Sequence, residues 1–540
     1  MKKKLHGNLS GLRNTQIKKI EDLYTFSTPP EYLIDPELAF NLVSLSHEIR
    51  RQIGILINRN GKAAFVIVGD ATKIVIPVTE GYNAVPGRLR GLRLIHTHLK
   101  DEPLTRDDLT DLALLQLDYI AAICISPNGT PGTLYSSHIL PDENADPYQI
   151  LEPSNMDHLK IGCMEKIVAL ESELTRKNAL YKPGTDTENA FLINAATVNP
   201  AEAYASIDEL KELCKTSQIN VIGSTVQRRK DIDPKYVVGK GKLSTLVIEA
   251  IQKYASLLVF DRELTPSQIR SITDFVEMKV IDRTQLILDI FAKQAKSREG
   301  KFQVELAQME YLLPRLVTKN TAMSRLAGGI GGRGPGETKL EINRRRVREN
   351  IDRLKKEIIK IRKQRQQQKS KRKRKSLPVI SIVGYTNAGK STLLNTLTQS
   401  DIIAADRLFA TLDPSSRRLR FPTDTEVIIT DTVGFIQNLP KELMEAFNAT
   451  LDELADADII LHVIDISNPR YQQQKKSVED ILKRMDLDKI PTVFVFNKMD
   501  KVDLDSFDDK WLLKQGVCIS AENKQSLTPL VEKLESLLHP

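Results

Sequence analysis

The sequence of 540 residues predicts a multi-domain α/β protein. β-rich apolar runs alternate with helical segments along most of the chain, which is the pattern of sheets covered by helices. A phosphate-loop pattern, G-x-x-x-x-G-K-S, lies between one such run and a helical segment. A long basic helical segment precedes that loop. We expect four regions: an N-terminal extension (1–185), a small α/β domain (190–300), a helical hairpin (301–376) and a nucleotide-binding domain (377–540).

In the N-terminal extension, residues 53–57, 64–68, 74–78 and 92–95 have the composition of strands. The last of them leads into His96-Thr97-His98, which Thr105 and Asp108 follow. This order resembles the H-x-H…S-x-x-D zinc signature of JAMM-type metalloproteins. Two imidazoles on one side of a strand and a carboxylate can hold zinc through three ligands, here His96, His98 and Asp108.

The match to that signature departs from it in three ways. The spacing to Thr105 is one residue short, Thr replaces Ser, and the expected upstream Glu is displaced, with Glu48 a few residues early. These departures favour a degenerate, metal-free interaction domain and leave the zinc site as the alternative. A further alternative, that the protein is a metal-dependent isopeptidase, depends on the same three candidate ligands alone.

Residues 190–300 indicate a small parallel sheet. Residues 220–223, 257–261 and 279–282 have the composition of short buried strands, and 243–254 and 266–276 that of helices.

The hairpin region is strongly basic. Between Lys339 and Lys375 there are 18 Lys or Arg residues and four acidic ones, while the net charge of the whole chain is +8. Apolar residues recur there at 4-3-4-3 spacing, as in a helix with a narrow apolar seam: Val347, Ile351, Leu354, Ile358 and Ile361. We expect residues 302–317 to form the partner helix, with its stripe at Val304, Leu306, Met309, Leu312, Leu313 and Leu316, and 369–376 to be a linker.

Clustered charge on a rigid arm is typical of a surface that contacts RNA phosphates, although a solvated helix is the alternative. Between the two predicted helices, six of the nine residues 328–336 are glycine, which predicts a loop. Its bare backbone can enter a tight RNA cavity; a plain connector is the alternative. The expected RNA contacts are Arg325, Gly328, Gly329, Arg333, Gly334, Arg344, Arg345 and Arg346.

The phosphate loop is Gly384-Tyr385-Thr386-Asn387-Ala388-Gly389-Lys390-Ser391. It follows the β-rich run 378–383 and opens a helix at Thr392, so backbone N–H groups and a helix N-terminus can surround phosphate oxygens. Lys390 would reach the β- and γ-phosphates, and Ser391 would hold Mg²⁺.

Three later motifs, each at the end of a predicted strand, complete the pattern of a guanine nucleotide site. Asp431-Thr432-Val433-Gly434 offers a carboxylate for a Mg²⁺-bound water and an N–H for the γ-phosphate. Asn497-Lys498-Met499-Asp500 offers a carboxylate for the guanine N1–H and 2-amino group, and Ser520-Ala521 a backbone N–H for O6. Phe409, Ala410 and Thr411 are the expected switch I contacts, with Thr411 as the second Mg²⁺ hydroxyl. Lys390, Thr411 and Gly434 are the candidate catalytic residues.

Phe435 follows Gly434, where Ras-like enzymes have a water-orienting Gln. An aromatic ring cannot orient water. We therefore expect slow intrinsic hydrolysis, with the water placed by another side chain, a K⁺ ion, a partner or the ribosome.

Composition indicates a cytoplasmic protein. The four cysteines are scattered, which argues against a disulfide framework, and no apolar run approaches the roughly 20 residues that span a bilayer. We expect a monomer without stable membrane insertion.

Residues 409–414 (FATLDP), 431–436 (DTVGFI) and 328–338 (GGIGGRGPGET) together resemble the HflX family of translational GTPases, as do 235–242 and 280–291. The resemblance covers roughly residues 190–540. It implies GTP hydrolysis with Mg²⁺, binding to the large ribosomal subunit, its rRNA and the 70S ribosome, and splitting or rescue of stalled ribosomes. An assembly GTPase acting on immature large subunits is the alternative. We also expect the extra C-terminal domain of many relatives, and its functions, to be absent.

Overall fold

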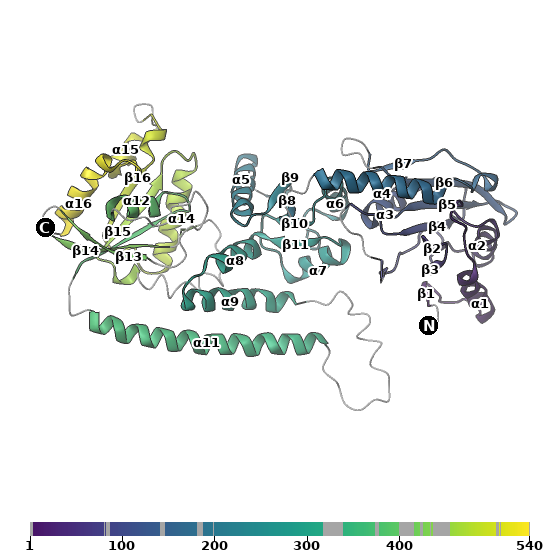
Figure 1. Ribbon diagram of the computed structural model, residues 1–540, viewed down its shortest axis with the longest axis horizontal. Helices are drawn as coiled ribbons and strands as arrows, with labels where there is room; N and C mark the ends of the chain where they lie inside the picture. The colour runs from purple at the N-terminus through teal and green to yellow at the C-terminus, as the bar shows by residue number, and fades with distance from the viewer. Residues whose placement is uncertain are drawn as a thin grey trace. The chain divides into compact units, whose positions relative to one another are not determined.

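The computed structural model describes residues 4–79, 81–82, 87–140, 146–180, 187–197, 199–316, 339–372, 377–398, 415–421, 425–432, 434–435, 454–503, 507 and 509–538. The chain forms two compact units. The first comprises residues 1–197, 220–258 and 271–280, and the second 198–219, 259–270 and 281–540. The predicted multi-domain α/β class is confirmed, with helices accompanying three separate sheets (Figure 1).

The first sheet has seven strands in the order β1-β3-β2-β4-β5-β6-β7. Its strands are β1 Leu5–Gly7, β2 Ile53–Asn58, β3 Ala63–Val68, β4 Leu92–His98, β5 Tyr119–Ile125, β6 Pro131–Ile139 and β7 Tyr148–Ile150. The associated helices are α1 Asn14–Asp22, η1 Leu23–Thr25, α2 Pro36–Ile49, α3 Arg106–Leu115, η2 Met156–His158 and α4 Cys163–Leu180. β4 and β5 are parallel and wholly buried, which places the end of β4 in the middle of the sheet.

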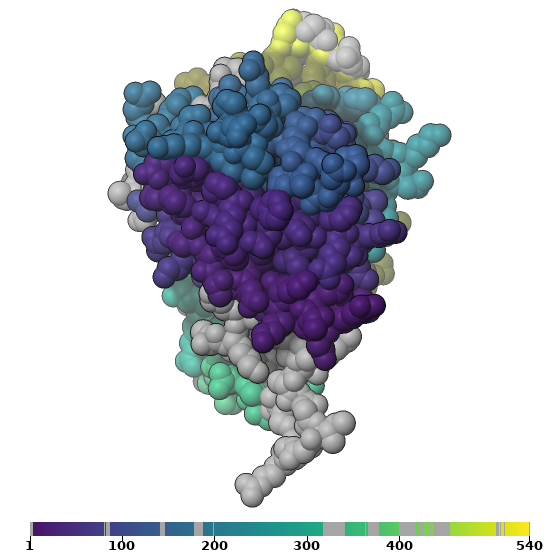
Figure 2. Space-filling view, turned by 90° about the vertical axis from the view of Figure 1, so that its right-hand side faces the viewer, coloured from purple at the N-terminus to yellow at the C-terminus, as the bar shows by residue number. Residues whose placement is uncertain are grey.

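One predicted strand of this region is wrong. Residues 74–78 form no strand, and Val75 and Val78 are exposed. Their composition is that of a strand, and Ile74 and Ile76 do pack against the core, but the segment belongs to none of the three sheets. Figure 2 views the face made by the N-terminal residues, coloured purple to blue.

The second sheet has four strands in the order β11-β10-β8-β9. Its elements are β8 Asn189–Ala196, α5 Pro200–Thr216, β9 Asn220–Arg228, α6 Lys240–Gln252, β10 Leu257–Phe260, α7 Pro266–Phe275, β11 Lys279–Asp282 and α8 Arg283–Gln294. β8, which the sequence pattern did not predict, pairs with β9 in parallel. Asp282 caps α8, because its carboxylate accepts a hydrogen bond from Gln285 N.

The third sheet has the order β13-β14-β12-β15-β16-β17. Its strands are β12 Val379–Gly384, β13 Ser415–Arg420, β14 Glu426–Asp431, β15 Ile459–Asp465, β16 Thr492–Asn497 and β17 Gly516–Cys518. The helices are α12 Lys390–Thr398, η4 Leu454–Asp456, α14 Tyr471–Arg484, η5 Met499–Lys501, α15 Lys510–Leu513, η6 Lys524–Leu527 and α16 Thr528–Leu538. β12 has parallel neighbours on both sides, β14 and β15. The strands that follow β12 in the sequence are thus added first on one side of it and then on the other, and ligands bind at such a switch point.

The hairpin consists of α9 Arg298–Leu312, η3 Leu313–Arg315 and α11 Lys339–Arg372, with α9 and α11 side by side in Figure 1. On α11 the predicted seam is present, since Ile351, Leu354 and Ile358 are buried. The predicted partner stripe on α9 is only partly correct, because Val304 is buried but Leu312 is 41% exposed. Tyr311 takes the inward position instead and donates a hydrogen bond to Asp282.

The hairpin differs from the prediction at both ends. It begins three residues earlier, at Arg298, because Ser297 caps the helix by accepting from Gly300 N. α11 also continues to Arg372, through residues predicted as linker. A helix without an apolar face can extend a packed helix by propagation alone. Among the described residues, no helix is both long enough and apolar enough to cross a bilayer.

Candidate nucleotide site and helical arm

The phosphate loop follows β12, the strand at the switch point. β12 ends at Gly384 and α12 begins at Lys390, so the loop turns directly from strand to helix. Gly389 has φ = 91°, and a Cβ built there would lie 2.2 Å from Asn497 Nδ2. Glycine is therefore required at this position for both the backbone conformation and the space.

Lys390 is the buried cation of this loop. Its side chain is almost fully enclosed, and Nζ donates a hydrogen bond of 2.8 Å to the backbone oxygen of Tyr385. Burial lowers the pKa of Lys390 to about 8, although Asp431 acts in the opposite direction. A phosphate placed beside Nζ would favour the charged form, because an anion compensates for the lost hydration.

Ser391, in the first turn of α12, meets Asp431, the last residue of β14. The Ser391 hydroxyl donates to Asp431 Oδ2 at 2.7 Å, and Asp431 is fully buried. Hydroxyl and carboxylate oxygens suit Mg²⁺, so this pair fits the ion that the sequence predicts. Gly434 lies against the same loop, since a Cβ there would be 2.8 Å from Thr386 Cγ2 and 3.0 Å from Lys390 Nζ.

Asn497 joins the phosphate loop to the predicted base-binding segments. Its Nδ2 donates to Ala388 O at 2.8 Å, and its Oδ1 accepts from Ala521 N at 2.9 Å. A hydrogen bond from the Ser520 side chain holds the pKa of Asp500 below its usual value, so that carboxylate is ionised at neutral pH. An exposed ionised carboxylate can accept from the guanine N1–H and 2-amino group.

Four of the predicted contacts, Phe409, Ala410, Thr411 and Val433, lie outside the described residues. The structure brings the others together: the phosphate loop and Thr392, Asp431, Thr432, Gly434, the 497–500 segment, Ser520 and Ala521. Asp465, which the sequence motifs did not include, pairs with Lys498 at 2.7 Å. Asp465 is the last residue of the buried apolar strand β15, and that apolar run was the signal in the sequence that could have indicated it.

A buried polar cluster connects the phosphate loop to α5 and α8. Tyr385 OH donates to Glu209 Oε1 at 2.5 Å, and Glu209 Oε2 pairs with Arg283 at 2.8 Å. Arg283 also pairs with Asp261 at 3.0 Å. Each of the three paired side chains is at most 7% exposed. Nothing in the sequence indicated this contact, because Glu209 and Tyr385 are 176 positions apart.

Ion pairs and the apolar seam hold the two arm helices together. Lys355 pairs with Glu310 at 2.8 Å, and Arg353 lies 3.9 Å from Glu305. Of the predicted RNA contacts, Arg344, Arg345 and Arg346 lie in the first turns of α11, whereas Arg325, Gly328, Gly329, Arg333 and Gly334 are outside the described residues. Arg345 and Arg346 are exposed, and Arg344 donates to Leu316 O at 3.1 Å.

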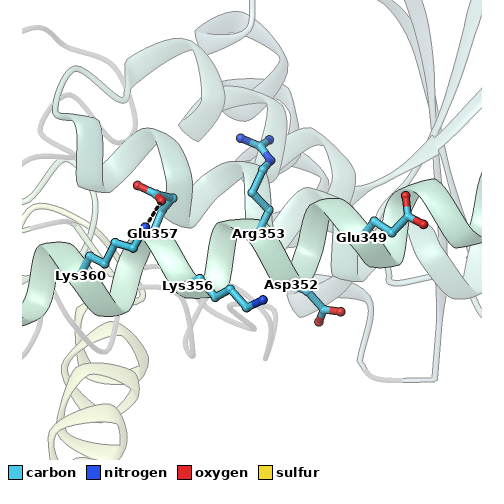
Figure 3. Close-up of a pocket in the computed structure, with 6 residues that line it drawn as sticks. All are labelled: Glu349, Asp352, Arg353, Lys356, Glu357 and Lys360. Atoms are coloured by element: carbon cyan, nitrogen blue, oxygen red, sulfur yellow. Dashed lines mark hydrogen bonds and ion pairs between the residues drawn. The ribbon is translucent and has the colours of Figure 1, made fainter.

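The middle of α11 carries balanced charge. Figure 3 shows a shallow pocket there lined by Glu349, Asp352, Arg353, Lys356, Glu357 and Lys360. Three are acidic and three basic, and Lys360 pairs with Glu357 at 2.8 Å. The excess of positive charge therefore lies toward the two ends of the helix, at 339–348 and 361–372.

The three predicted zinc ligands belong to the other unit. His96 and His98 on β4 and Asp108 on α3 come together there.

Comparison with known proteins finds relatives for residues 204–498. Three family models match consecutive parts of the chain: "GTP-binding GTPase N-terminal" at residues 204–292, "GTP-binding GTPase Middle Region" at 294–372 and "50S ribosome-binding GTPase" at 379–498. A protein described as GTPase HflX from Caldanaerobacter subterraneus subsp. tengcongensis is 46% identical over 350 residues, which are 65% of this chain and 80% of the relative. GTPase HflX of Escherichia coli strain K12 is 44% identical over 298 residues, 55% of this chain and 70% of the relative.

A solved structure of a GTP-binding protein from Sulfolobus solfataricus in complex with GDP is 24% identical. It has a TM-score of 0.37 over 65% of this chain and 98% of that one.

Proposed function

Because the chain belongs to the HflX family and is a GTP hydrolase that binds GTP and GDP, we propose that its nucleotide state controls binding to the large ribosomal subunit. We further propose that it splits or rescues stalled 70S ribosomes. The observation that carries this proposal is that the nucleotide site and the basic arm belong to one compact unit. The model matched at 379–498 is described as a 50S ribosome-binding GTPase, in agreement with it.

In the nucleotide site, Lys390 neutralises the β- and γ-phosphates, and the Gly434 N–H contacts the γ-phosphate. Mg²⁺ held by Ser391, Thr411 and, through water, Asp431 would neutralise charge on the phosphate oxygens. Phe435 contributes only its backbone, because its ring is buried and its N–H and C=O bond Gly384 and Thr386. The attacking water would therefore be placed by another side chain, a K⁺ ion, a partner or the ribosome.

We propose that the buried cluster carries the nucleotide state to the arm. Tyr385 lies in the phosphate loop, and its hydroxyl reaches Glu209 on α5, which holds Arg283 on α8. α8 packs against α9, and Tyr311 of α9 bonds Asp282 at the start of α8. α9 in turn packs along α11. A shift of the loop on binding the γ-phosphate would move these packed elements together.

Tyr385→Phe tests this route, since it removes only the hydroxyl. We expect GTP hydrolysis to be retained, with a decrease in folding stability of about 1–3 kcal/mol, because Glu209 Oε1 is left without its buried partner. The ratio of large-subunit affinities in the GTP-analogue and GDP states should fall toward one. The matched control is Tyr471→Phe, because the Tyr471 hydroxyl donates to Asp509 elsewhere in the nucleotide-binding domain. An unchanged affinity ratio in Tyr385→Phe would remove the cluster from the mechanism.

The arm supplies contacts to rRNA phosphates in this proposal. Clustered arginines on a rigid helix bind phosphates without regard to sequence, so the affinity should fall steeply as salt rises. The charge distribution along α11 indicates which part of the helix would contact phosphates, because the ends carry the excess of positive charge and the middle does not.

Replacing Arg344, Arg345 and Arg346 by Ala should weaken large-subunit binding. It should also reduce the slope of log affinity against log salt by about one for each phosphate that the variant no longer neutralises. The measurement is filter binding or sedimentation over a range of KCl. The matched control neutralises Arg353, Lys356 and Lys360, which lie among acidic residues in Figure 3, and should change the slope much less. Equal effects of the two triple variants would contradict a phosphate interface at the start of α11.

A further inference from the structure

We propose that His96, His98 and Asp108 form a three-ligand site for a divalent transition-metal ion, and that Zn²⁺ occupies it. This inference concerns the N-terminal unit and is independent of the proposed ribosome function. It rests on how the fold directs three donor atoms toward one point.

The two imidazoles come from one face of a central strand. His96 and His98 alternate along β4 and therefore point to the same side of the sheet. Thr97 between them points to the other side, where its hydroxyl lies 2.7 Å from Ser46 Oγ. Both imidazoles are at most 1% exposed.

The donor separations agree with those around a tetrahedral ion. His96 Nε2 lies 3.0 Å from His98 Nε2, 3.3 Å from Asp108 Oδ1, and His98 Nε2 lies 3.5 Å from Asp108 Oδ2. Ligands at about 2.0–2.1 Å from tetrahedral Zn²⁺ are about 3.3 Å apart. Asp108 faces the two imidazoles through different carboxylate oxygens, and with one donor atom per residue the three atoms lie within 4.8 Å of one another. A shared ion would draw these donor atoms closer together.

Hydrogen bonds outside the cluster orient two of the three ligands. His98 Nδ1 lies 3.0 Å from the backbone oxygen of Glu102. A carbonyl only accepts, so Nδ1 carries the proton and the lone pair of neutral His98 is on Nε2, facing His96. Thr105 donates to Asp108 Oδ2 from both its N–H and its hydroxyl, each at 2.7 Å. Such outer partners are what fix metal ligands in place.

The ligand set points to binding rather than peptide hydrolysis. Two neutral imidazoles and one carboxylate suit Zn²⁺ and related ions better than Mg²⁺ or Ca²⁺, which prefer oxygen ligands. Glu48 is not available as a catalytic base, because its carboxylate bonds Gln16 and Lys19 at the surface. Within the described part of the chain, the cluster contains only these three candidate ligands, so a fourth position is left for water or an exchangeable ligand.

The test uses the full-length protein, stripped with a chelator and returned to buffer with excess Mg²⁺. We expect one equivalent of Zn²⁺ by elemental analysis, and visible absorption bands of tetrahedral type when Co²⁺ is substituted. The thermal transition of the protein should move upward with Zn²⁺, since the ion ties the end of β4 to α3.

Asp108→Asn and His96→Ala should each weaken Zn²⁺ binding by more than about 100-fold. Thr105→Ala should weaken it by about 10- to 100-fold, as expected for an outer partner of a ligand. His158→Ala, a histidine elsewhere in the unit, is the matched control and should bind Zn²⁺ normally. A retained circular dichroism spectrum and retained GTP hydrolysis show that a variant is folded. If His96→Ala does not fold, the nearly isosteric Asp108→Asn still tests the proposal.

Two results would overturn the proposal. One is wild-type protein that binds Zn²⁺ and Co²⁺ only substoichiometrically, which would leave the three side chains as a hydrogen-bonded cluster. The other is full binding by both Asp108→Asn and His96→Ala, which would place the ion elsewhere.

Discussion

Lys390→Ala is expected to reduce the GTP turnover of the protein by at least about 10²- to 10³-fold, the scale of removing one preorganised charge from a transition state. Lys390 is the buried cation of the phosphate loop, with Nζ beside the site that Gly434 approaches. The fold should survive, because burial disfavours the charged lysine and its removal leaves only the Tyr385 carbonyl without this donor.

The measurement for Lys390→Ala is phosphate release under single-turnover conditions, with GDP affinity measured separately. Lys475→Ala provides the matched control, because Lys475 also belongs to the nucleotide-binding domain but pairs with Glu479 on α14. Normal GTP turnover in Lys390→Ala would show that this lysine does not act in GTP hydrolysis.

Replacing residues 328–336 by a short neutral turn is expected to abolish splitting or rescue of ribosomes. This glycine-rich segment joins α9 and α11 in the sequence and has one charged residue, Arg333. It therefore contributes little to affinity, whereas its bare backbone is suited to a tight RNA cavity. GTP hydrolysis and much of the subunit binding should remain, because the nucleotide site and the arginines of α11 are untouched.

Light scattering of 70S ribosomes after mixing with protein and GTP measures this effect. The control variant replaces the segment with nine residues that keep the glycines and Arg333 and change only Ile330 to Val. Splitting at the wild-type rate by the neutral-turn variant would show that the segment is a connector.

The motifs of the predicted nucleotide site are local in the sequence, and the structure brings their described residues together. Each motif directly follows a strand, and parallel strands bring their carboxyl ends to one edge, so Ser391 and Asp431 meet although 40 positions separate them. β13 and β15 were missed, since no recognised motif accompanied them. Residues 74–78 were wrongly predicted as a strand because composition alone does not show whether a neighbouring strand is present to pair with the segment.

Contacts between distant parts of the chain were not predictable. Glu209 on α5 reads as one more acidic residue of an amphipathic helix, yet it is buried and binds Tyr385. The three candidate zinc ligands were only partly predictable from the sequence. Their spacing suggested a degenerate signature, and only the folded strand and helix show how closely the donor atoms approach.

The central claim is that the nucleotide state controls binding to the large ribosomal subunit. Its most direct test is sedimentation of the wild-type protein with isolated subunits, 70S ribosomes and immature large subunits, in the presence of a non-hydrolysable GTP analogue or GDP. We predict strong co-sedimentation with mature large subunits in the analogue state, conversion of 70S particles to subunits, and much weaker binding with GDP. Equal binding in the two nucleotide states, or binding to immature large subunits alone, would contradict the account.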